Sequence, residues 1–541
     1  MTAINLPPET IALPTLEEIL QALHQPACYP HHPNRVEMVQ THISAVFLAG
    51  EEVYKLKKPI RFSFLDYSTP ALRQYYCHEE VRLNHRLAPT VYLGVVPLLR
   101  VGHDYHLREV VNMHDATVVE YLVRMRRLPP ERTLAALLAA GQVTKTSIHA
   151  LAKRLVHFHH TAATTDAAIY GAPDTVWRAV ADNFHETACF VGQTISERQY
   201  SRIRDFSQSF FREHQALMRQ RMTQGRIREG HGDLRCDHVY FLDQGISIID
   251  CIEFSLRLRT GDVASELAFL AMDLELHGAP GLAAELLQAY AVQADDPALF
   301  FLLPFYQCYR AYVRGKVESL KSQEPEVSAE DREQARQQAQ RSFRLAARYA
   351  RGTPSPALLV VCGRVGTGKS TVAQQLSEQT GFVSFNSDVI RKRLAGILPT
   401  IHVEAEYGSG SYSQEFSQRT YATLLAQAEE ELGTGRGVIV DATCKQREDR
   451  RAFLELGQRQ QVPVLFLECR TSLAEVERRL RERERRGDSV SDATWELARR
   501  EHETRPTFDD IPAQCHVIID TEQDIDEALE AVEERITEGK K

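Results

Sequence analysis

The sequence predicts two domains, an α+β N-terminal domain and an α/β C-terminal domain built on a doubly wound parallel sheet. Its 541 residues are more than one ordinary hydrophobic core accommodates. Strand patterns and then helical runs fill the first part, whereas short apolar strands alternate with helical runs from Leu358 onward. We therefore expect a first domain over residues 1–322, a helical linker over 323–355 and a second domain over 356–541.

The linker is expected there because helix-breaking residues lie at both of its ends. Pro325 interrupts the preceding helical run, and Ser328 can cap a new helix whose charged, glutamine-rich sequence runs to Tyr349. Gly352 and Pro354 then end that helix. Such a run of charged side chains is typical of a solvated connecting helix.

Composition indicates a soluble protein of the cytoplasm. Hydrophobic residues make up 43% of the chain, and no apolar run approaches the roughly 18 residues that a membrane span needs. The N-terminus lacks a basic region followed by an apolar stretch, so no secretory signal is expected. A net charge of −9 argues against broad attachment to nucleic acid, and the ten cysteines lack the Cys-x-x-Cys pairs of a structural zinc site. Composition does not indicate an oligomeric state.

A lysine-bearing β-hairpin is the first candidate for phosphate chemistry. Residues 42–47 alternate apolar and polar side chains, residues 49–52 form a turn, and residues 53–58 continue as a second strand. A strand lysine can hold phosphate oxygens when an acid on the following helix orients it, and we expect Glu79 and Glu80 to begin such a helix. By itself, a lysine-rich strand is more often a solvated edge.

Two aspartates flank a second predicted hairpin. Asp233 belongs to the segment His231-Gly232-Asp233 before the hairpin, and Asp250 ends it. Phosphate transfer to a hydroxyl group needs one carboxylate to accept the proton and another to bind magnesium, and Asp233 and Asp250 fit these roles in this order. Either aspartate alone would more often be a turn or capping residue, but the combination favours the catalytic interpretation.

These segments, with Ile249-Asp250 and Gly261-Asp262 before an apolar helix, resemble the aminoglycoside phosphotransferase family over roughly residues 35–315. The resemblance implies a two-lobed, protein-kinase-like fold, with Val119–Val123 as the adenine-facing hinge. It also implies four residue roles: a catalytic base, a magnesium ligand, a phosphate-holding lysine and the acidic partner of that lysine. In this order the residues are Asp233, Asp250, Lys57 and Glu80.

His238 departs from the family pattern, because it stands where the family usually has a second metal-binding asparagine. Imidazole is a poor magnesium ligand, since that ion prefers hard oxygen atoms. We keep His238 as a candidate metal residue with two alternatives. Either His238 holds Asp233 in place, or the second ion is weak or absent.

The second domain opens with a strand, a glycine-rich turn and a helix, which is the context of a P-loop. The apolar strand Leu358–Cys362 precedes the turn, and the helix begins at Lys369. Backbone amides and Lys369 are expected to hold phosphate oxygens, and Ser370 to bind magnesium. The expected nucleotide-binding residues are Gly363, Arg364, Val365, Gly366, Thr367, Gly368, Lys369, Ser370 and Thr371.

Further acids are expected at strand ends of this domain, where α/β folds bind ligands. We predict strands at 383–385, 437–440, 464–467 and 516–519. Asp441 follows the strand at 437–440 and is a candidate magnesium ligand. Asp388, with Arg391 one helical turn later, is a candidate base for an acceptor, although a helix N-cap is nearly as good an interpretation of Asp388.

An arginine-rich stretch, residues 478–486, is a candidate lid over the phosphates. Most of these arginines fit a solvated helix with paired charges, so we expect one or two to be catalytic and take Arg485 as the candidate. With Gly363–Thr371, Asp441-Ala442-Thr443 and Ser491-Asp492-Ala493, this half resembles small-molecule and zeta-toxin-like P-loop kinases. The order of both halves is similar to bacterial bifunctional aminoglycoside phosphotransferase/ATP-binding proteins, which implies ATP and Mg²⁺ as cofactors.

Three functional hypotheses remain. The favoured one is an ATP-dependent phosphotransferase whose two kinase-like sites act on small polar or hydroxyl acceptors of unknown identity. The second makes one site catalytic and the other a nucleotide-sensing regulator, with His238 marking the N-terminal site as the degenerate one. The third is an ATPase that acts on a protein partner, and it is disfavoured because no added oligomerisation module follows the P-loop.

Overall fold

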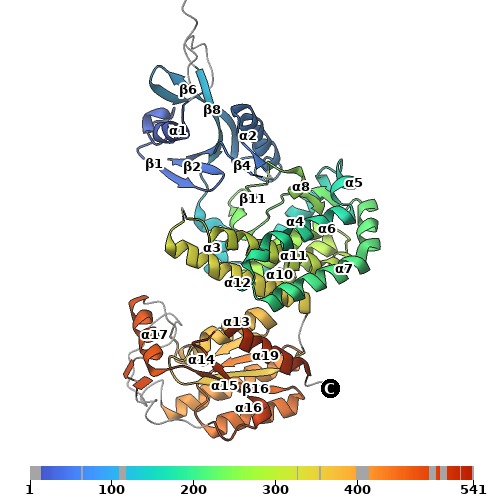
Figure 1. Cartoon of the computed structure of the whole chain (residues 1–541), viewed down its shortest axis with the longest axis vertical. Coiled ribbons are helices and arrows are strands. Elements are labelled where there is room, and N and C mark those ends of the chain that lie inside the picture. The colour runs from blue at the N-terminus through green and yellow to red at the C-terminus, as the bar shows by residue number, and fades with distance from the viewer. Residues whose placement is uncertain are drawn as a thin grey trace, which may run out of the picture. The chain divides into compact units, whose positions relative to one another are not determined.

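The computed structural model describes residues 14–538, apart from 63–64, 109–116, 326, 353–354, 398–412, 487–494, 497, 500–507 and 524. The chain divides into two compact units (Figure 1). The first unit comprises Met1–Phe190 and Ser207–Val317, and the second comprises Val191–Phe206 and Glu318–Lys541. The short segment Val191–Phe206 thus belongs with the later part of the chain, which no sequence pattern had indicated.

An antiparallel sheet forms the N-terminal part of the first unit, with the strand order β1-β2-β3-β8-β6-β7. The strands are β1 (Val36–Gln40), β2 (Ser44–Ala49), β3 (Glu52–Lys57), β8 (Thr117–Arg126), β6 (Tyr92–Val101) and β7 (Asp104–Leu107). The predicted lysine-bearing hairpin is confirmed as β2 and β3. The prediction of a hinge at Val119–Val123 is wrong, because these residues lie within β8 in the middle of the sheet.

The two faces of β3 have different neighbours because side chains alternate along a strand. Tyr54 and Leu56 pack into an apolar core that includes residues of α1 (Leu16–Leu23). Lys55 and Lys57 point to the opposite face, where both contact Glu80 of α2 (Pro70–Asn84). Glu80 lies well inside this helix rather than at its beginning.

Helices make up most of the remainder of the first unit. They are α3 (Leu134–Ala139), α4 (Lys145–Thr161), α5 (Ala167–Tyr170), α6 (Pro173–Thr187), α7 (Glu197–Thr223), α8 (Leu256–Arg259), α9 (Val263–Leu276), α10 (Pro280–Gln293) and α11 (Leu299–Lys321). The beginning of α7, up to Phe206, and the end of α11, from Glu318, belong to the second unit. Three two-stranded sheets complete the unit: β4 (Arg61–Phe62) with β5 (Leu65–Asp66), β9 (Ile227–Glu229) with β12 (Thr260–Asp262), and β10 (Val239–Leu242) with β11 (Gly245–Ile248). This combination of an antiparallel sheet and a helical region confirms the predicted α+β class.

A parallel sheet of five strands forms the centre of the second unit, in the order β14-β15-β13-β16-β17. The strands are β14 (Val383–Asn386), β15 (Val438–Asp441), β13 (Leu358–Gly363), β16 (Val464–Arg470) and β17 (His516–Asp520). The helices are α12 (Ala329–Arg351), α13 (Lys369–Thr380), α14 (Ser387–Leu394), α15 (Gln414–Gly433), α16 (Arg447–Gln460), α17 (Leu473–Arg486) and α19 (Ile525–Glu538). One apolar core joins the sheet to α15 and α16, and another joins it to α13 and α19. The doubly wound α/β class is therefore confirmed.

The helix α12 begins as predicted, because the Ser328 side chain accepts a hydrogen bond from the Asp331 amide at 3.1 Å. It is not a solvated connector, however. Ala339, Phe343 and Arg344 are among the side chains buried along one of its faces. The arginines on this face obscured the apolar stripe in the sequence. Over the described part of the chain, no helix is both long and apolar enough to cross a bilayer.

Candidate functional site

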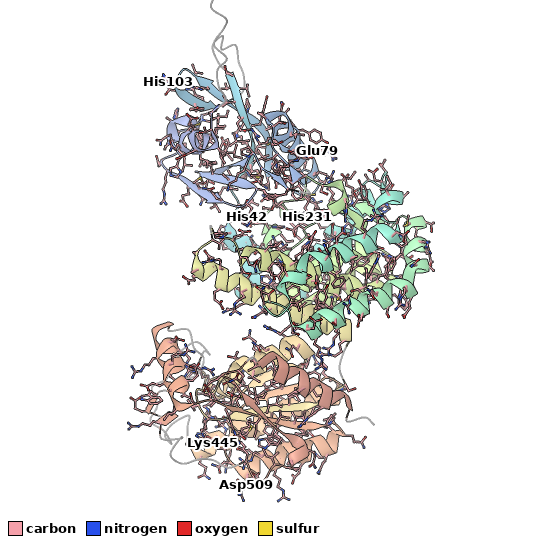
Figure 2. The ribbon with its side chains drawn as sticks, viewed as in Figure 1. His42, Glu79, His103, His231, Lys445 and Asp509 are labelled. Atoms are coloured by element: carbon pink, nitrogen blue, oxygen red, sulfur yellow. The ribbon has the colours of Figure 1, made fainter. Side chains whose placement is uncertain are left out.

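The segment His231-Gly232-Asp233 follows β9 and is held by the buried carboxylate of Glu266. Figure 2 shows His231 on the side of the helical region that faces the antiparallel sheet. Glu266 Oε2 accepts hydrogen bonds from the backbone amides of His231 at 2.6 Å and Gly232 at 3.2 Å. Gly232 has φ +88°, and a Cβ there would lie 3.1 Å from Cα of Arg259. Any other residue would therefore strain the loop that presents Asp233.

The Asp233 carboxylate is partly exposed and is contacted by basic groups. Arg235 Nε donates to both of its oxygens, at 3.2 and 3.1 Å. Burial raises the pKa of Asp233, but the charges of Arg235, His238 and Arg314 outweigh burial, so the pKa lies below its usual value. The carboxyl group is therefore ionised at neutral pH and can accept a proton.

Asp250 follows β11 with a positive φ of +66°, which is uncommon for an aspartate. Its Oδ1 accepts a hydrogen bond from Lys55 Nζ at 2.7 Å, and its Oδ2 lies 3.7 Å from His238 Nε2. The charge of Lys55 holds the pKa of Asp250 well below the ordinary range. Because His238 Nδ1 also donates to the Asp233 carbonyl oxygen at 2.8 Å, this histidine lies between the two predicted acids.

The two lysines of β3 have different partners. Lys57 has no exposed surface, and its ammonium donates to Glu80 Oε2 at 2.6 Å and to Glu253 Oε1. Lys55 donates to the other oxygen of Glu80 at 2.9 Å and to Asp250, and its side chain is 14% exposed. We had predicted Lys57 as the phosphate-holding lysine, and the sequence did not indicate Lys55 because both lysines share one face of the strand. Glu253, which also accepts a hydrogen bond from Tyr67, was not predicted either.

In the second unit, the predicted P-loop connects β13 to α13. Thr367 Oγ1 and Lys369 Nζ both donate to the Arg364 carbonyl oxygen, at 2.8 and 2.7 Å. Gly363 has φ +130°, and a Cβ there would lie 2.6 Å from the Cys469 carbonyl oxygen. Because α13 begins at Lys369, the amides of its first turn follow directly on those of the loop, an arrangement suited to binding an anion. The nine predicted nucleotide-binding residues thus lie together.

Asp441 ends β15 next to the P-loop. Its Oδ2 accepts hydrogen bonds from Ser370 Oγ at 2.7 Å and from Asn386 Nδ2 at 2.6 Å. Burial raises the pKa of Asp441, and the charge of Lys369 opposes this rise. A hydroxyl and a carboxylate so close together form a donor set of hard oxygens that fits magnesium. Asn386 was not predicted, although it is paired with Asp441 at the ends of neighbouring parallel strands.

The helix-cap alternative for Asp388 is wrong. Asn386 caps α14, because its Oδ1 accepts hydrogen bonds from the amides of Asp388 at 2.9 Å and Val389 at 3.1 Å. The Asp388 carboxylate is therefore not the cap, and its charge raises the pKa of Asp441 beyond the effect of burial. Arg391, its predicted companion, is largely buried and donates to Ser417 Oγ at 3.3 Å.

The arginine-rich stretch lies entirely in α17. Arg485 belongs to this helix, but its side chain and the segment Ser491-Asp492-Ala493 lie outside the described residues. Arg478 pairs with acids of its own helix, as expected for a solvated face. Arg479 instead donates to Thr521 Oγ1 at 3.0 Å, and its Nη1 lies 3.0 Å from the position of a Cβ on Gly368. Arg479 is therefore an arginine beside the P-loop that sequence reasoning did not choose.

Comparisons with known proteins agree with this division of the chain. A family model described as an AAA domain matches residues 358–504. The uncharacterized protein Rv2004c of Mycobacterium tuberculosis is 30% identical over 466 residues, which cover 86% of this chain and 89% of that protein. A shikimate kinase of Xanthomonas campestris is 30% identical over 103 residues, which cover 19% of this chain and 54% of that enzyme. A solved choline/ethanolamine kinase family protein from Mesorhizobium loti is 11% identical with a TM-score of 0.36, over 62% of this chain and 99% of that chain. The similarity to the mycobacterial protein thus extends over both units, and the match to the AAA domain model lies within the second.

Proposed function

The chain belongs to the family of the mycobacterial protein Rv2004c, and from the two sites described above we propose that it is an ATP-dependent phosphotransferase with two kinase sites. Each site transfers phosphate to a hydroxyl group of a small polar acceptor. The proposal rests on one arrangement that both units share. In each unit, the charge of a lysine favours the ionised form of a carboxylate that can bind magnesium. Lys55 contacts Asp250 at 2.7 Å, and the charge of Lys369 acts on the buried Asp441.

At the N-terminal site, we assign Asp233 as the base that accepts the proton of the acceptor's hydroxyl group, because its carboxylate is ionised and partly exposed. Lys55, rather than Lys57, holds phosphate oxygens, because Lys55 contacts Asp250 and remains partly exposed. Glu80 orients Lys55. The Asp250 carboxylate offers hard oxygens to magnesium, which when bound neutralises charge on the transferring phosphate.

At the C-terminal site, the P-loop amides and Lys369 bind the phosphates of ATP. Ser370 and Asp441 hold magnesium through their oxygens, and Asp388 takes the acceptor's proton. Arg479, beside Gly368, and Arg485 are the arginines proposed to stabilise negative charge on the transferring phosphate. The similarity to a shikimate kinase supports a small-molecule acceptor for this site.

Lys369→Ala tests the C-terminal site. We expect the full-length variant to lose at least about tenfold in nucleotide affinity at this site, because the removed ammonium makes a charge-assisted contact with phosphate. Calorimetry with a non-hydrolysable ATP analogue and magnesium should then show one tight site instead of two. Lys153→Ala, which removes an exposed lysine of α4, is the matched control. Two unchanged sites and unchanged phosphate release would contradict the assignment.

His238→Asn distinguishes the two accounts of the N-terminal site. His238 Nδ1 donates to the Asp233 carbonyl oxygen, and Nε2 accepts a hydrogen bond from Arg235 Nη2 at 3.0 Å, so the Nε2 lone pair is already occupied. We therefore expect the substitution to lower the rate at every magnesium concentration without changing the magnesium dependence. A magnesium titration of turnover, in protein that also carries Lys369→Ala, measures this. A shifted titration would instead favour a second ion at this position, and normal nucleotide binding without turnover in either form would favour a sensing domain.

A further inference from the structure

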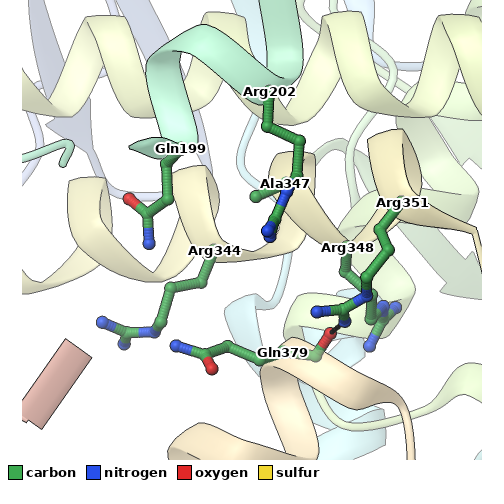
Figure 3. A pocket seen from close by; sticks show the side chains of 7 residues that line it. All are labelled: Gln199, Arg202, Arg344, Ala347, Arg348, Arg351 and Gln379. Carbon is green, nitrogen blue, oxygen red and sulfur yellow. Dashed lines mark hydrogen bonds between the residues drawn. The ribbon is translucent and has the colours of Figure 1, made fainter. Parts of the chain in front are cut away.

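A cavity in the second unit is lined by basic and amide side chains, and none of its lining residues carries a carboxylate. The lining residues are Gln199, Arg202, Arg344, Ala347, Arg348, Arg351 and Gln379. They come from the beginning of α7, the last two turns of α12 and the end of α13 (Figure 3). The figure shows the guanidinium of Arg344 and the amide ends of Gln199 and Gln379 turned toward one another.

The side-chain amide of Gln379 indicates that this cavity takes a ligand. It is 5% exposed, and neither its amide nitrogen nor its amide oxygen has a hydrogen-bond partner. A buried primary amide without partners is unfavourable and rare in folded proteins. The side-chain amide of Gln379 could also be placed with its nitrogen and oxygen exchanged. In either orientation, the nitrogen lacks a hydrogen-bond acceptor and the oxygen lacks a donor. A ligand in the cavity can supply both.

Three of the four lining arginines make contacts at the end of α13. Arg348 Nη1 donates to the Glu378 carbonyl oxygen at 3.1 Å, and Arg351 Nη2 donates to the Gln379 carbonyl oxygen. These two arginines therefore cap the helix end, which is an ordinary structural role. The Glu378 carboxylate accepts from Arg344 at 3.4 Å. None of these contacts satisfies the Gln379 amide.

We propose that this cavity binds a phosphoryl group, either of inorganic phosphate or of a small phosphomonoester. Phosphate oxygens accept hydrogen bonds from the arginines and from the Gln379 amide nitrogen, which matches the chemistry of the lining. A singly protonated phosphate also has a hydroxyl that donates to the Gln379 amide oxygen. Sulfate carries no proton at neutral pH, so the same site should discriminate against it.

The space left between the lining side chains is about 10 Å³ in this structure, so a phosphoryl group enters only when the arginine side chains move aside. Their long aliphatic stems permit this movement. The site is separate from the P-loop, because Gln379 and Lys369 lie at opposite ends of α13, about 15 Å apart at the rise of an α-helix.

The test uses the full-length protein in phosphate-free buffer, with inorganic phosphate, methyl phosphate and sulfate as probes. Calorimetry and thermal melting are compared for the wild type, Gln379→Leu, Arg202→Met and Lys369→Ala. Leucine is close in size to glutamine and removes the unpartnered amide, so Gln379→Leu should fold and melt no lower than the wild type without ligand. We expect Gln379→Leu and Arg202→Met to weaken phosphate binding at least about tenfold, and Lys369→Ala to leave this site intact.

The probes also identify the source of the phosphoryl group. Methyl phosphate binding as tightly as inorganic phosphate would support a phosphorylated metabolite as the ligand, whereas binding of inorganic phosphate alone would support the free ion. Sulfate should bind at least about tenfold more weakly than phosphate. Equal phosphate binding by the wild type and Gln379→Leu would overturn the proposal. So would the absence of phosphate binding, its loss in Lys369→Ala alone, or equal affinity for sulfate.

Discussion

Replacing Asp233 with asparagine is expected to slow phosphate transfer at the N-terminal site about 10²- to 10⁴-fold while leaving nucleotide binding unchanged. The carboxyl group is ionised because basic neighbours hold its pKa below the usual value, so it is ready to accept the acceptor's proton. Asparagine has nearly the same shape but cannot take that proton. Transfer of labelled phosphate from ATP to a cell metabolite extract, by protein that also carries Lys369→Ala, measures the N-terminal site alone.

Asp237→Asn is the matched control for this experiment. Asp237 lies four residues after Asp233, its side chain is 59% exposed, and it also faces Arg235, at 3.7 Å. We expect its substitution to leave transfer within about twofold of the wild type, because a weak exposed ion pair contributes little. Full acceptor-dependent activity in Asp233→Asn, or an equal loss in Asp237→Asn, would remove Asp233 from the role of base.

Sequence patterns predicted those helices and strands whose buried residues form a recognisable pattern of apolar side chains in the sequence. The strands of the parallel sheet are buried on both faces, so they appear as short apolar runs such as Leu358–Cys362. The hairpin of β2 and β3 was visible from alternation. The buried face of α12 was not, because Arg344 and its neighbours bury charged side chains that a sequence pattern assigns to solvent.

Site residues could be predicted where a motif fixes their neighbours in the chain, as in the P-loop. Contacts between distant segments were beyond sequence reasoning. Lys55 and Asp250 meet although 195 residues separate them, so periodicity could not favour Lys55 over Lys57. Sequence reasoning did not choose Arg479 of α17 for a related reason. Arg479 and Arg485 differ by six residues, or roughly 240° around a helix, and only the tertiary structure shows that Arg479 faces Gly368.

Replacing each of the two lysines of β3 with methionine is expected to have a different main effect, on stability for Lys57 and on phosphate transfer for Lys55. Lys57 has no exposed surface, and removing its charge leaves the buried carboxylates of Glu80 and Glu253 without their shared cation. We expect Lys57→Met to lower the free energy of unfolding by about 3–5 kcal/mol. Lys55→Met should cost less stability, because Glu80 stays paired with Lys57 and the Asp250 side chain is 46% exposed. It should nevertheless lower N-terminal transfer about 10²- to 10³-fold, as expected when a phosphate-facing charge is lost.

Tryptophan fluorescence can follow the unfolding of the first unit alone. The chain has two tryptophans, and Trp177 stacks on Phe211 within this unit. In a Trp495→Phe background, urea denaturation monitored at Trp177 therefore reports the stability of the lysine-bearing unit. Adding Glu253→Gln to Lys57→Met removes one unpaired buried charge, so it should recover part of the lost stability. If Lys55→Met instead loses as much stability as Lys57→Met and keeps full transfer, Lys55 is structural and does not hold phosphate.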